Sequence, residues 1–257
     1  MIALKKYSPT TRFSDRAGIY SAYRPGYPED VIWHLKDKIG LKPGWAVADI
    51  GAGTGLFSRL LLENGNTVYC VEPNAAMRQE GAAFLKGYPK CAWVDGAAED
   101  TTLPAHSMDV VTCAQAFHWF NPEKTKKEFV RIAKKGAPVV LLWSSRKNDQ
   151  NDFMREHDAL LRKFGKNYAP IHNAMSDPKI IEAFYSKTSS QAVFGNSQLL
   201  TQEAYLGRIF SASYMPGSNT PVYQEIKAAF SSLFRKYNKN GTVTLYYEIK
   251  VYYGLLN

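Results

Sequence analysis

The stretch Val47–Gly55, V-A-D-I-G-A-G-T-G, decides the fold of this 257-residue chain. Its first four residues are typical of a short buried strand, and a helical pattern begins at Leu56. Between them, Gly51, Gly53 and Gly55 remove every Cβ from one side of the turn. A ligand can therefore lie against bare backbone beside a helix N-terminus, as nucleotide-type cofactors do in doubly wound α/β folds.

An acidic residue and the glycine spacing discriminate between cofactor classes. Asp49 precedes the first glycine by two residues, where its charge would repel a pyrophosphate by about 1–4 kcal/mol at 4 Å but attract an ammonium group. S-adenosylmethionine carries an ammonium group but no phosphate, so Asp49 favours it over NAD. Glu72 ends the next predicted strand, Thr67–Glu72, where an acid can accept hydrogen bonds from both ribose hydroxyls. The spacing G-x-G-x-G also departs from the dinucleotide pattern G-x-G-x-x-G.

The run D-I-G-A-G-T-G followed by V-Y-C-V-E-P resembles the first two motifs of class I S-adenosylmethionine-dependent methyltransferases. The resemblance implies a doubly wound, Rossmann-like α/β fold with a seven-stranded sheet in the order 3-2-1-4-5-7-6. It implies S-adenosylmethionine as the cofactor, the alternative being a glycine-rich turn of an NAD or FAD protein. In this part of the chain it assigns cofactor contacts to Asp49, Gly51, Ala52, Gly53, Gly55, Glu72, Pro73 and Met77.

Residues 13–28, F-S-D-R-A-G-I-Y-S-A-Y-R-P-G-Y-P, are too rich in aromatic side chains for a linker. The segment resembles the N-terminal signature of methyltransferase type 11 proteins similar to trans-aconitate methyltransferase, where it covers the cofactor. The resemblance places Tyr20, Tyr23 and Arg24 near the methionine end of the cofactor, with Tyr20 assigned to the acceptor. Tyrosine faces can screen a sulfonium from water, and a guanidinium can pair with the cofactor carboxylate. Alternatively, the tyrosines only pack this segment onto the sheet.

The turn Asp95–Asp100, D-G-A-A-E-D, resembles the adenine-binding turn of the same family. The resemblance assigns the backbone N–H groups of Ala97 and Ala98 to the adenine edge. Glu99 is assigned to the cofactor as well, with a helix-capping role as the alternative.

The segment Cys113–Phe120, C-A-Q-A-F-H-W-F, follows a fourth predicted strand, Met108–Thr112. The carboxyl end of that strand faces cofactor and substrate in a doubly wound sheet. Gln115 and Phe117 are predicted to flank the sulfonium. His118 is the candidate general base, because histidine is the usual base near neutral pH. A structural histidine that holds the loop is an equal alternative.

The second half of the chain predicts a helical cap, residues 148–240, inserted around one late strand in a single domain spanning 1–257. Period-two alternation predicts the last strand over 243–251, and Gln191–Gly195 is a weaker strand candidate. The amphipathic helices predicted in the cap are Asp152–Phe164, Pro178–Lys187, Thr201–Phe210 and Val222–Tyr237.

Residues 201–214 of this cap, T-Q-E-A-Y-L-G-R-I-F-S-A-S-Y, resemble the acceptor-pocket stretch of the type 11 group. The resemblance assigns the acceptor to Tyr205, Arg208 and Tyr214. A guanidinium binds a carboxylate through two parallel hydrogen bonds, so a small acidic acceptor is expected. The alternative is a core stripe that includes Tyr205 and Ile209, with Arg208 as a surface charge.

Composition restricts the function further. The net charge of +9 is compatible with an anionic partner, and the densest basic stretch is one predicted helix and its exit, residues 124–135. No basic tail or RNA-binding module accompanies the charge, so a nucleic-acid partner is not expected. The three cysteines, Cys70, Cys91 and Cys113, fall in or beside predicted strands, which predicts reduced thiols and a cytoplasmic protein. No apolar run reaches the length of a membrane span, and no metal-binding spacing is present.

We therefore expect a methyltransferase, monomeric or homodimeric, that acts on a small-molecule acceptor, possibly a carboxylate, by in-line methyl transfer. Two alternatives remain: an RNA or protein methyltransferase, and a non-catalytic regulator that binds the cofactor. A dehydrogenase is the third choice.

Overall fold

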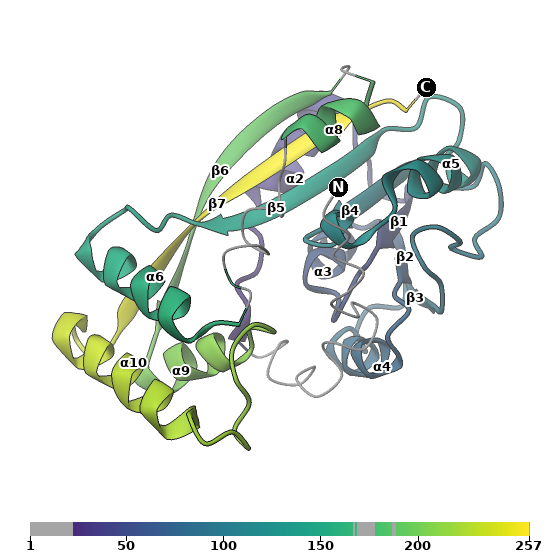
Figure 1. Cartoon of the computed structure of the whole chain (residues 1–257). Coiled ribbons are helices and arrows are strands. Elements are labelled where there is room, and N and C mark those ends of the chain that lie inside the picture. Colours follow the sequence, from purple (N-terminus) through teal and green to yellow (C-terminus); the bar gives the residue numbers. More distant parts are fainter. Residues whose placement is uncertain (1–22, 167, 169–177, 187–188, 257) are drawn as a thin grey trace.

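The computed structural model describes residues 23–166, 168, 178–186 and 189–256 (Figure 1). The helices are α2 (Asp30–Ile39), α3 (Leu56–Glu63), α4 (Ala75–Phe84), η2 (Phe117–Trp119), α5 (Pro122–Ile132), α6 (Asp152–Phe164), α8 (Pro178–Phe184), α9 (Gln202–Phe210) and α10 (Tyr223–Tyr237). The strands are β1 (Ala46–Ile50), β2 (Thr67–Val71), β3 (Cys91–Val94), β4 (Val110–Ala114), β5 (Val139–Arg146), β6 (Ser190–Leu200) and β7 (Val243–Gly254).

The seven strands form one sheet in the order β3-β2-β1-β4-β5-β7-β6. Strands β1 to β5 are parallel, and β7 lies antiparallel between β5 and β6. The α/β class and the strand order predicted from the glycine turn are thus confirmed. Because the parallel strands end at one edge of the sheet, the turns after β1, β2 and β4 are brought together there.

Several strands differ in extent from the sequence prediction. The fourth strand is Val110–Ala114 and not Met108–Thr112, and the last strand continues beyond residue 251 to Gly254. Strand β6 spans eleven residues where the sequence predicted only Gln191–Gly195. Each residue of β6 pairs with one in β7, from Ser190 opposite Tyr253 to Leu200 opposite Val243. This pairing extends the strand through Gly195 and Asn196, two residues of low strand propensity.

Apolar side chains cover both faces of the sheet. In β1, Ala48 and Ile50 belong to the core beneath α5 and α8, and Val47 belongs to the core beneath α2 and α3. This alternation follows from the two-residue period of a strand. The arrangement leaves the ends of the strands, not their faces, available for a site.

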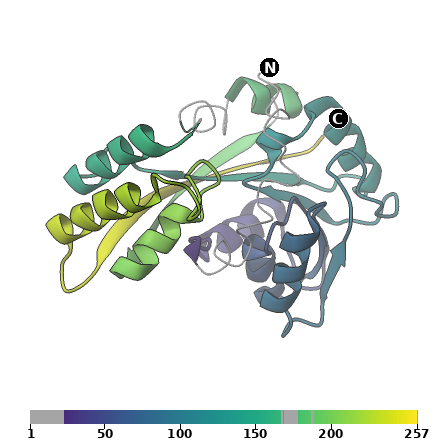
Figure 2. The same cartoon turned by 60° about the horizontal axis from the view of Figure 1, so that its bottom comes forward.

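A third apolar core lies at the far ends of β6 and β7, where α6, α9 and α10 pack together (Figures 1 and 2). Its members come from all three helices and from β7, for example Phe153, Ile209, Phe230 and Leu245. These helices lie within the predicted cap and extend beyond the parallel half of the sheet. None of the helices in the described ranges combines the length and hydrophobicity that crossing a membrane requires.

Candidate functional site

The three glycines of the turn after β1 have positive φ angles of 70°, 59° and 82° at positions 51, 53 and 55. Two of them are needed for packing: a Cβ on Gly51 would lie 2.5 Å from the Cβ of Ala116, and one on Gly55 would lie 2.6 Å from Cδ1 of Leu85. A Cβ on Gly53 would meet no atom within 4 Å. The open space that the sequence predicted on one side of the turn therefore lies at Gly53.

Asp49 ends up beneath the turn, with only 1% of its surface exposed. Its carboxylate accepts hydrogen bonds from Ser58 Oγ in α3 at 2.6 Å and from Thr112 Oγ1 in β4 at 2.9 Å. Burial raises the pKa of Asp49 to about 6, although the two hydroxyl groups lower it. Two hydroxyl groups thus contact this carboxylate, and its contact with the ammonium group of the cofactor stays a prediction.

Glu72 lies beside the glycine turn, as predicted from its position after β2. Its Oε2 accepts from the backbone amide of Gly53 at 2.9 Å, and its Oε1 accepts from the amide of Asn74 at 3.0 Å. Burial raises the pKa of Glu72, and these two hydrogen bonds oppose the rise. Each carboxylate oxygen keeps a second lone pair for a ligand hydroxyl.

The next residues along the chain form the start of α4. Asn74 caps this helix by accepting from the amide of Met77 at 3.1 Å, and Met77 is buried at 4% exposure. Arg78 donates to the carbonyl of Glu72 at 2.7 Å and to both oxygens of Asp95 at 2.9 and 2.8 Å. The sequence analysis missed Asn74 and Arg78. The N-cap signature of Asn74 was readable in the sequence, but the Arg78–Asp95 pair forms only through the fold.

In the turn after β3, one of the backbone N–H groups predicted to bind adenine has a partner within the protein. The amide of Ala97 donates to the carbonyl of Asp100 at 3.0 Å, so this N–H already has a partner within the turn. Ala98 is 4% exposed and belongs to the core beneath α5. Glu99 accepts from the amide of Asn121 at 2.8 Å, next to the start of α5, which fits the capping alternative. The cofactor roles of these three residues stay predictions.

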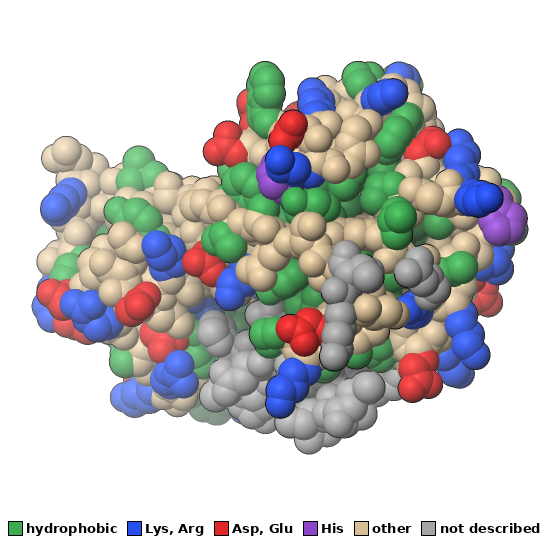
Figure 3. Space-filling view, turned by 90° about the horizontal axis from the view of Figure 1, so that it is seen from above, with side chains coloured by type: hydrophobic (Ala, Val, Ile, Leu, Met, Phe, Trp, Pro, Cys, Tyr) green, Lys and Arg blue, Asp and Glu red, His purple; other side chains and the backbone are tan. Residues whose placement is uncertain are grey.

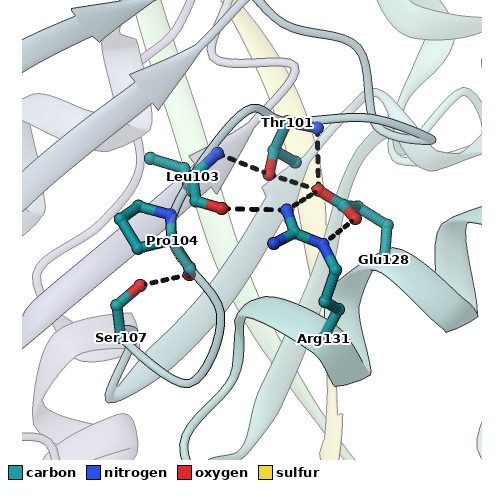
Figure 4. Close-up of polar contacts among 6 residues, drawn as sticks. All are labelled: Thr101, Leu103, Pro104, Ser107, Glu128 and Arg131. Carbon is teal, nitrogen blue, oxygen red and sulfur yellow. Dashed lines mark hydrogen bonds and ion pairs between the residues drawn. The ribbon is translucent and has the colours of Figure 1, made fainter.

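An ion pair between the buried Glu128 and the exposed Arg131 holds the segment after this turn in place (Figure 4). Glu128 of α5 accepts from the amide and the hydroxyl of Thr101, and Arg131 binds both carboxylate oxygens of Glu128 at 2.7 Å each. Arg131 also donates to the carbonyl of Leu103 at 2.9 Å. The hydrogen bonds of Thr101 and Arg131 lower the pKa of Glu128 in spite of its burial. The pair therefore fixes the segment after residue 100 against α5.

Gln115 and Phe117 follow β4 at the predicted edge of the sheet. Gln115 has a φ of 60°, and its side-chain amide donates to the carbonyl of Ser144 in β5 at 2.6 Å. Phe117 is 3% exposed and packs edge-on against Phe184 and Trp143. In this structure Gln115 links β4 to β5 and Phe117 is a core residue, and their contacts with the sulfonium stay predictions.

His118 in η2 is poorly suited to act as a base. Burial lowers the pKa of His118 to about 3, so its imidazole is neutral at physiological pH. Its Nδ1 is buried and has no hydrogen-bond partner among the described residues. A group of such low proton affinity takes up few protons near neutral pH, and the catalytic role of His118 stays a prediction.

Of the predicted N-terminal segment, residues 23–28 are described, while Tyr20 lies outside the described residues. Tyr23 packs against Gly207 of α9 so closely that a Cβ on that glycine would lie 2.5 Å from the tyrosine ring. The backbone carbonyl of Tyr23 accepts from the side chain of Gln198 in β6 at 3.0 Å. Arg24 Nη2 lies 3.5 Å from the carbonyl of Ser211. The segment is thus held against β6 and the end of α9.

The predicted acceptor residues of the cap fall into two groups. Tyr205 is fully buried and its hydroxyl lies 2.8 Å from Nδ1 of His157, so it belongs to the cap core, as does Ile209. Arg208 is not the surface charge of the alternative: it is 5% exposed, and its Nε donates to the hydroxyl of Tyr247 at 3.3 Å. Tyr205 and Ile209 are therefore core residues, as in the alternative, whereas Arg208 is buried and not at the surface.

A second arginine, which the sequence analysis did not single out, lies close to Tyr214. Arg146 ends β5, and its Nη2 donates to the hydroxyls of Tyr214 at 2.9 Å and Tyr168 at 3.2 Å. Burial would raise the pKa of Tyr214, but the charges of Arg146, Arg208 and Arg24 lower it below its usual value. Arg146 thus contacts the hydroxyl of Tyr214 directly, and the charges of Arg208 and Arg24 also act on it. The available signal was a charged residue three positions after the apolar run Val139–Trp143, at the edge where ligands bind.

In sequence, the chain is similar to proteins described as methyltransferases. Residues 48–141 match the family model described as a methyltransferase domain. The chain is 30% identical over 202 residues to uncharacterized methyltransferases of Mycobacterium bovis and Mycobacterium tuberculosis, covering 79% of this chain and 76% of each relative. An uncharacterized methyltransferase of Schizosaccharomyces pombe is 29% identical over 130 residues, about half of each chain.

Solved structures share the fold at lower identity. Phosphoethanolamine N-methyltransferase 2 of Haemonchus contortus, in complex with S-adenosyl-L-methionine, superposes with a TM-score of 0.58 at 14% identity, over 100% of this chain and 60% of that one. The YcgJ protein of Bacillus subtilis superposes with a TM-score of 0.56 at 16% identity, over 90% of this chain and 99% of that one.

Proposed function

This chain belongs to the class I methyltransferases, and from this premise we propose that it transfers the methyl group of S-adenosylmethionine to a carboxylate of a small acidic molecule. The family accounts for the methyl donor. The acceptor class is supported by one observation: within the described ranges, neither Arg208 nor Arg146 has a carboxylate within ion-pair distance. Arg208 is buried, and Arg146 is partly buried with its Nε enclosed. A guanidinium withdrawn from water without a counterion is costly, and an anionic ligand would relieve that cost.

The residues at the carboxyl edge fit the cofactor. Gly53 leaves open space beside the turn, and Glu72 lies against it with lone pairs free for the ribose hydroxyls. Asp49 contributes negative charge beneath the same turn, which favours the ammonium group over a phosphate. We assign Gly51, Ala52, Gly53, Glu72 and Asp49 to cofactor binding on this basis.

When bound, the cofactor supplies an electrophilic methyl group on a sulfonium sulfur. The acceptor carboxylate forms the new O–CH₃ bond as the S–CH₃ bond breaks, and the electron pair of that bond stays on sulfur. No proton moves in this step, so a histidine that is neutral and weakly basic, such as His118, is sufficient. The protein contributes alignment and a buried, water-poor environment, which favours a reaction between opposite charges.

The acceptor class is tested with pairs of small molecules that differ only in charge. Each carboxylic acid of a metabolite panel is assayed beside its methyl ester and its amide, with release of S-adenosylhomocysteine as the readout. Turnover restricted to free acids supports the proposal, and turnover restricted to neutral compounds overturns it. Calorimetric titration with S-adenosylmethionine and with NAD tests the cofactor independently of the acceptor.

Two other outcomes would favour the alternatives. Methylation of RNA or protein with a steep salt dependence would indicate a macromolecular acceptor. On the face shown in Figure 3, basic and acidic side chains are interspersed and form no continuous basic stripe, which gives this alternative no support. Tight cofactor binding without turnover on any compound would favour a non-catalytic regulator.

A further inference from the structure

We propose that Arg146 forms a second anionic subsite, which holds an acidic group of the acceptor that is not itself methylated. The proposal rests on the function proposed above and extends it from one carboxylate to a molecule with two anionic groups. It concerns a residue of β5, whereas the acceptor residues predicted from the sequence lie in the N-terminal segment and the cap.

The position of Arg146 brings it into the same site as Arg208. Arg146 is the last residue of β5, and across the sheet it pairs with Tyr247 of β7. Arg208 donates to the hydroxyl of that same tyrosine at 3.3 Å. Burial lowers the pKa of His157, and the charges of Arg146 and Arg208 lower it further, so both guanidinium groups also lie near this histidine. Two cations from different elements thus approach one small region.

Neither of these two cations is neutralised by the described part of the protein. No carboxylate lies within 4 Å of either guanidinium there, although ten other basic side chains in the same part do have such a partner. The Nε of Arg146 is buried and has no hydrogen-bond partner among the described residues. Arg208 is buried and Arg146 is partly buried, so two negative charges are needed to neutralise them, and a monocarboxylate supplies one.

The neighbours of Arg146 are arranged to hold it in place and leave donors for a ligand. Tyr168 accepts from Arg146 and donates to Oδ1 of Asp158 at 2.5 Å, and Asp158 is itself held by Asn148 and Arg162. Tyr214 also accepts from Arg146, and no described residue accepts the proton of its hydroxyl. We therefore assign this proton, together with Arg146, to an oxygen of the second acidic group.

This subsite would give the enzyme charge selectivity. A diacid supplies one carboxylate to Arg146 and another to Arg208. A monoacid leaves one of these two guanidinium groups without a counterion. Replacing Arg146 should therefore affect diacids and spare monoacids, because monoacids do not need it. Asp158 is a positioning residue in this scheme, because it acts on the ligand only through Tyr168 and Arg146.

The experiment compares malonate, succinate, glutarate and adipate with acetate, propionate, butyrate and valerate. Binding is measured calorimetrically with S-adenosylhomocysteine present, so it needs no turnover. We expect wild type to bind at least one dicarboxylate about 10–100-fold more tightly than its monocarboxylate, the range of a charge-assisted hydrogen bond. Arg146→Gln should abolish this preference, and Arg146→Lys should restore part of it. Arg235→Gln, at an exposed arginine of α10, is the matched control and should keep the preference.

Tyr214→Phe provides a second variant if Arg146→Gln does not fold, and it should reduce the preference while leaving cofactor binding intact. The proposal is overturned if wild type binds no dicarboxylate more tightly than the monocarboxylates, or if folded Arg146→Gln and Tyr214→Phe both keep the preference. It is equally overturned if Arg146→Gln weakens both series to the same extent. Failure of the proposed function is a different result: binding with the expected preference, but no methylation of any acid.

Discussion

The backbone amide of Gly53 donates a hydrogen bond to Oε2 of Glu72 across 2.9 Å. This contact joins the turn after β1 to the end of β2, two segments that the parallel sheet brings to the same edge. The second oxygen of Glu72 accepts from the amide of Asn74 at 3.0 Å. The carboxylate is therefore oriented by backbone donors before any ligand binds, which reduces the ordering cost of binding.

Glu72→Gln should weaken S-adenosylmethionine binding by about 1.5–3 kcal/mol, or roughly 10–150-fold in Kd. The amide nitrogen of glutamine cannot accept a hydrogen bond, so one backbone donor loses its partner and the ribose loses a charged acceptor. Calorimetric titration measures the effect. Glu123→Gln, in the exposed first turn of α5, is the control and should bind normally. Equal affinity of Glu72→Gln and wild type would exclude Glu72 as a ribose ligand.

Asp49→Asn should stabilise the ligand-free protein at neutral pH while weakening cofactor binding. A pKa raised from 3.8 to about 6 means that the folded state binds more protons than the unfolded state between these values, so stability falls as pH rises through that interval. The charged carboxylate then costs roughly 3 kcal/mol above pH 6. Asparagine removes this cost, and the hydroxyls of Ser58 and Thr112 can rotate to accept from its amide.

Urea unfolding of Asp49→Asn at two pH values separates this effect from a general change in packing. The gain in the free energy of unfolding should be present at pH 7.5 and almost absent at pH 3.8, where the wild-type aspartate is protonated in the folded state and about half protonated in the unfolded state. A gain of the same size at both pH values would contradict the electrostatic explanation.

His118→Ala should leave carboxylate methylation within about tenfold of wild type, less than the loss of a general base produces. The neutral His118 takes no proton near pH 7, because burial lowers its pKa to about 3. For the same reason, kcat of the wild type should not follow a histidine titration between pH 6 and 8. The test is kcat against pH for both proteins, with cofactor affinity measured in parallel. A loss of several orders of magnitude with cofactor binding preserved would restore His118 as the base.

The stability of the wild type should also depend on His118 at acidic pH. Its folded pKa lies below the unfolded value of 6.5, so the unfolded state binds the extra proton between about 3 and 6.5. This contribution to stability is complete above pH 6.5 and is lost as pH falls toward 3. Acid unfolding of His118→Ala should therefore depend less on pH in this range.

Gly207→Ala should destabilise the protein by about 1–3 kcal/mol through overpacking, because its Cβ would overlap the ring of Tyr23. In a Tyr23→Ala background, the same substitution should be neutral or stabilising by up to about 1 kcal/mol, since alanine has the higher helix propensity. Thermal unfolding of the two single variants and the double variant gives the coupling. Additive effects would show that Tyr23 and Gly207 do not touch in solution.

The sequence alone determined the glycine turn and the strands beside it, because these depend on local signals. Glycines at 51, 53 and 55 specify a turn with positive φ angles, and Glu72 stands where the next strand ends. The strand order came from the family resemblance that these residues carry, and the sheet has that order. The period-two pattern of β7 likewise predicted its strand from neighbouring residues alone.

Only the tertiary structure decided which side chains of the cap meet. Arg146 and Tyr214 are 68 positions apart, and their contact depends on where β5 ends and how α9 packs. Periodicity cannot distinguish a buried arginine at 208 from a surface charge, because burial depends on elements that come later in the chain. The same applies to the pKa values of Asp49 and His118, which are set by desolvation, and desolvation exists only once the chain has folded.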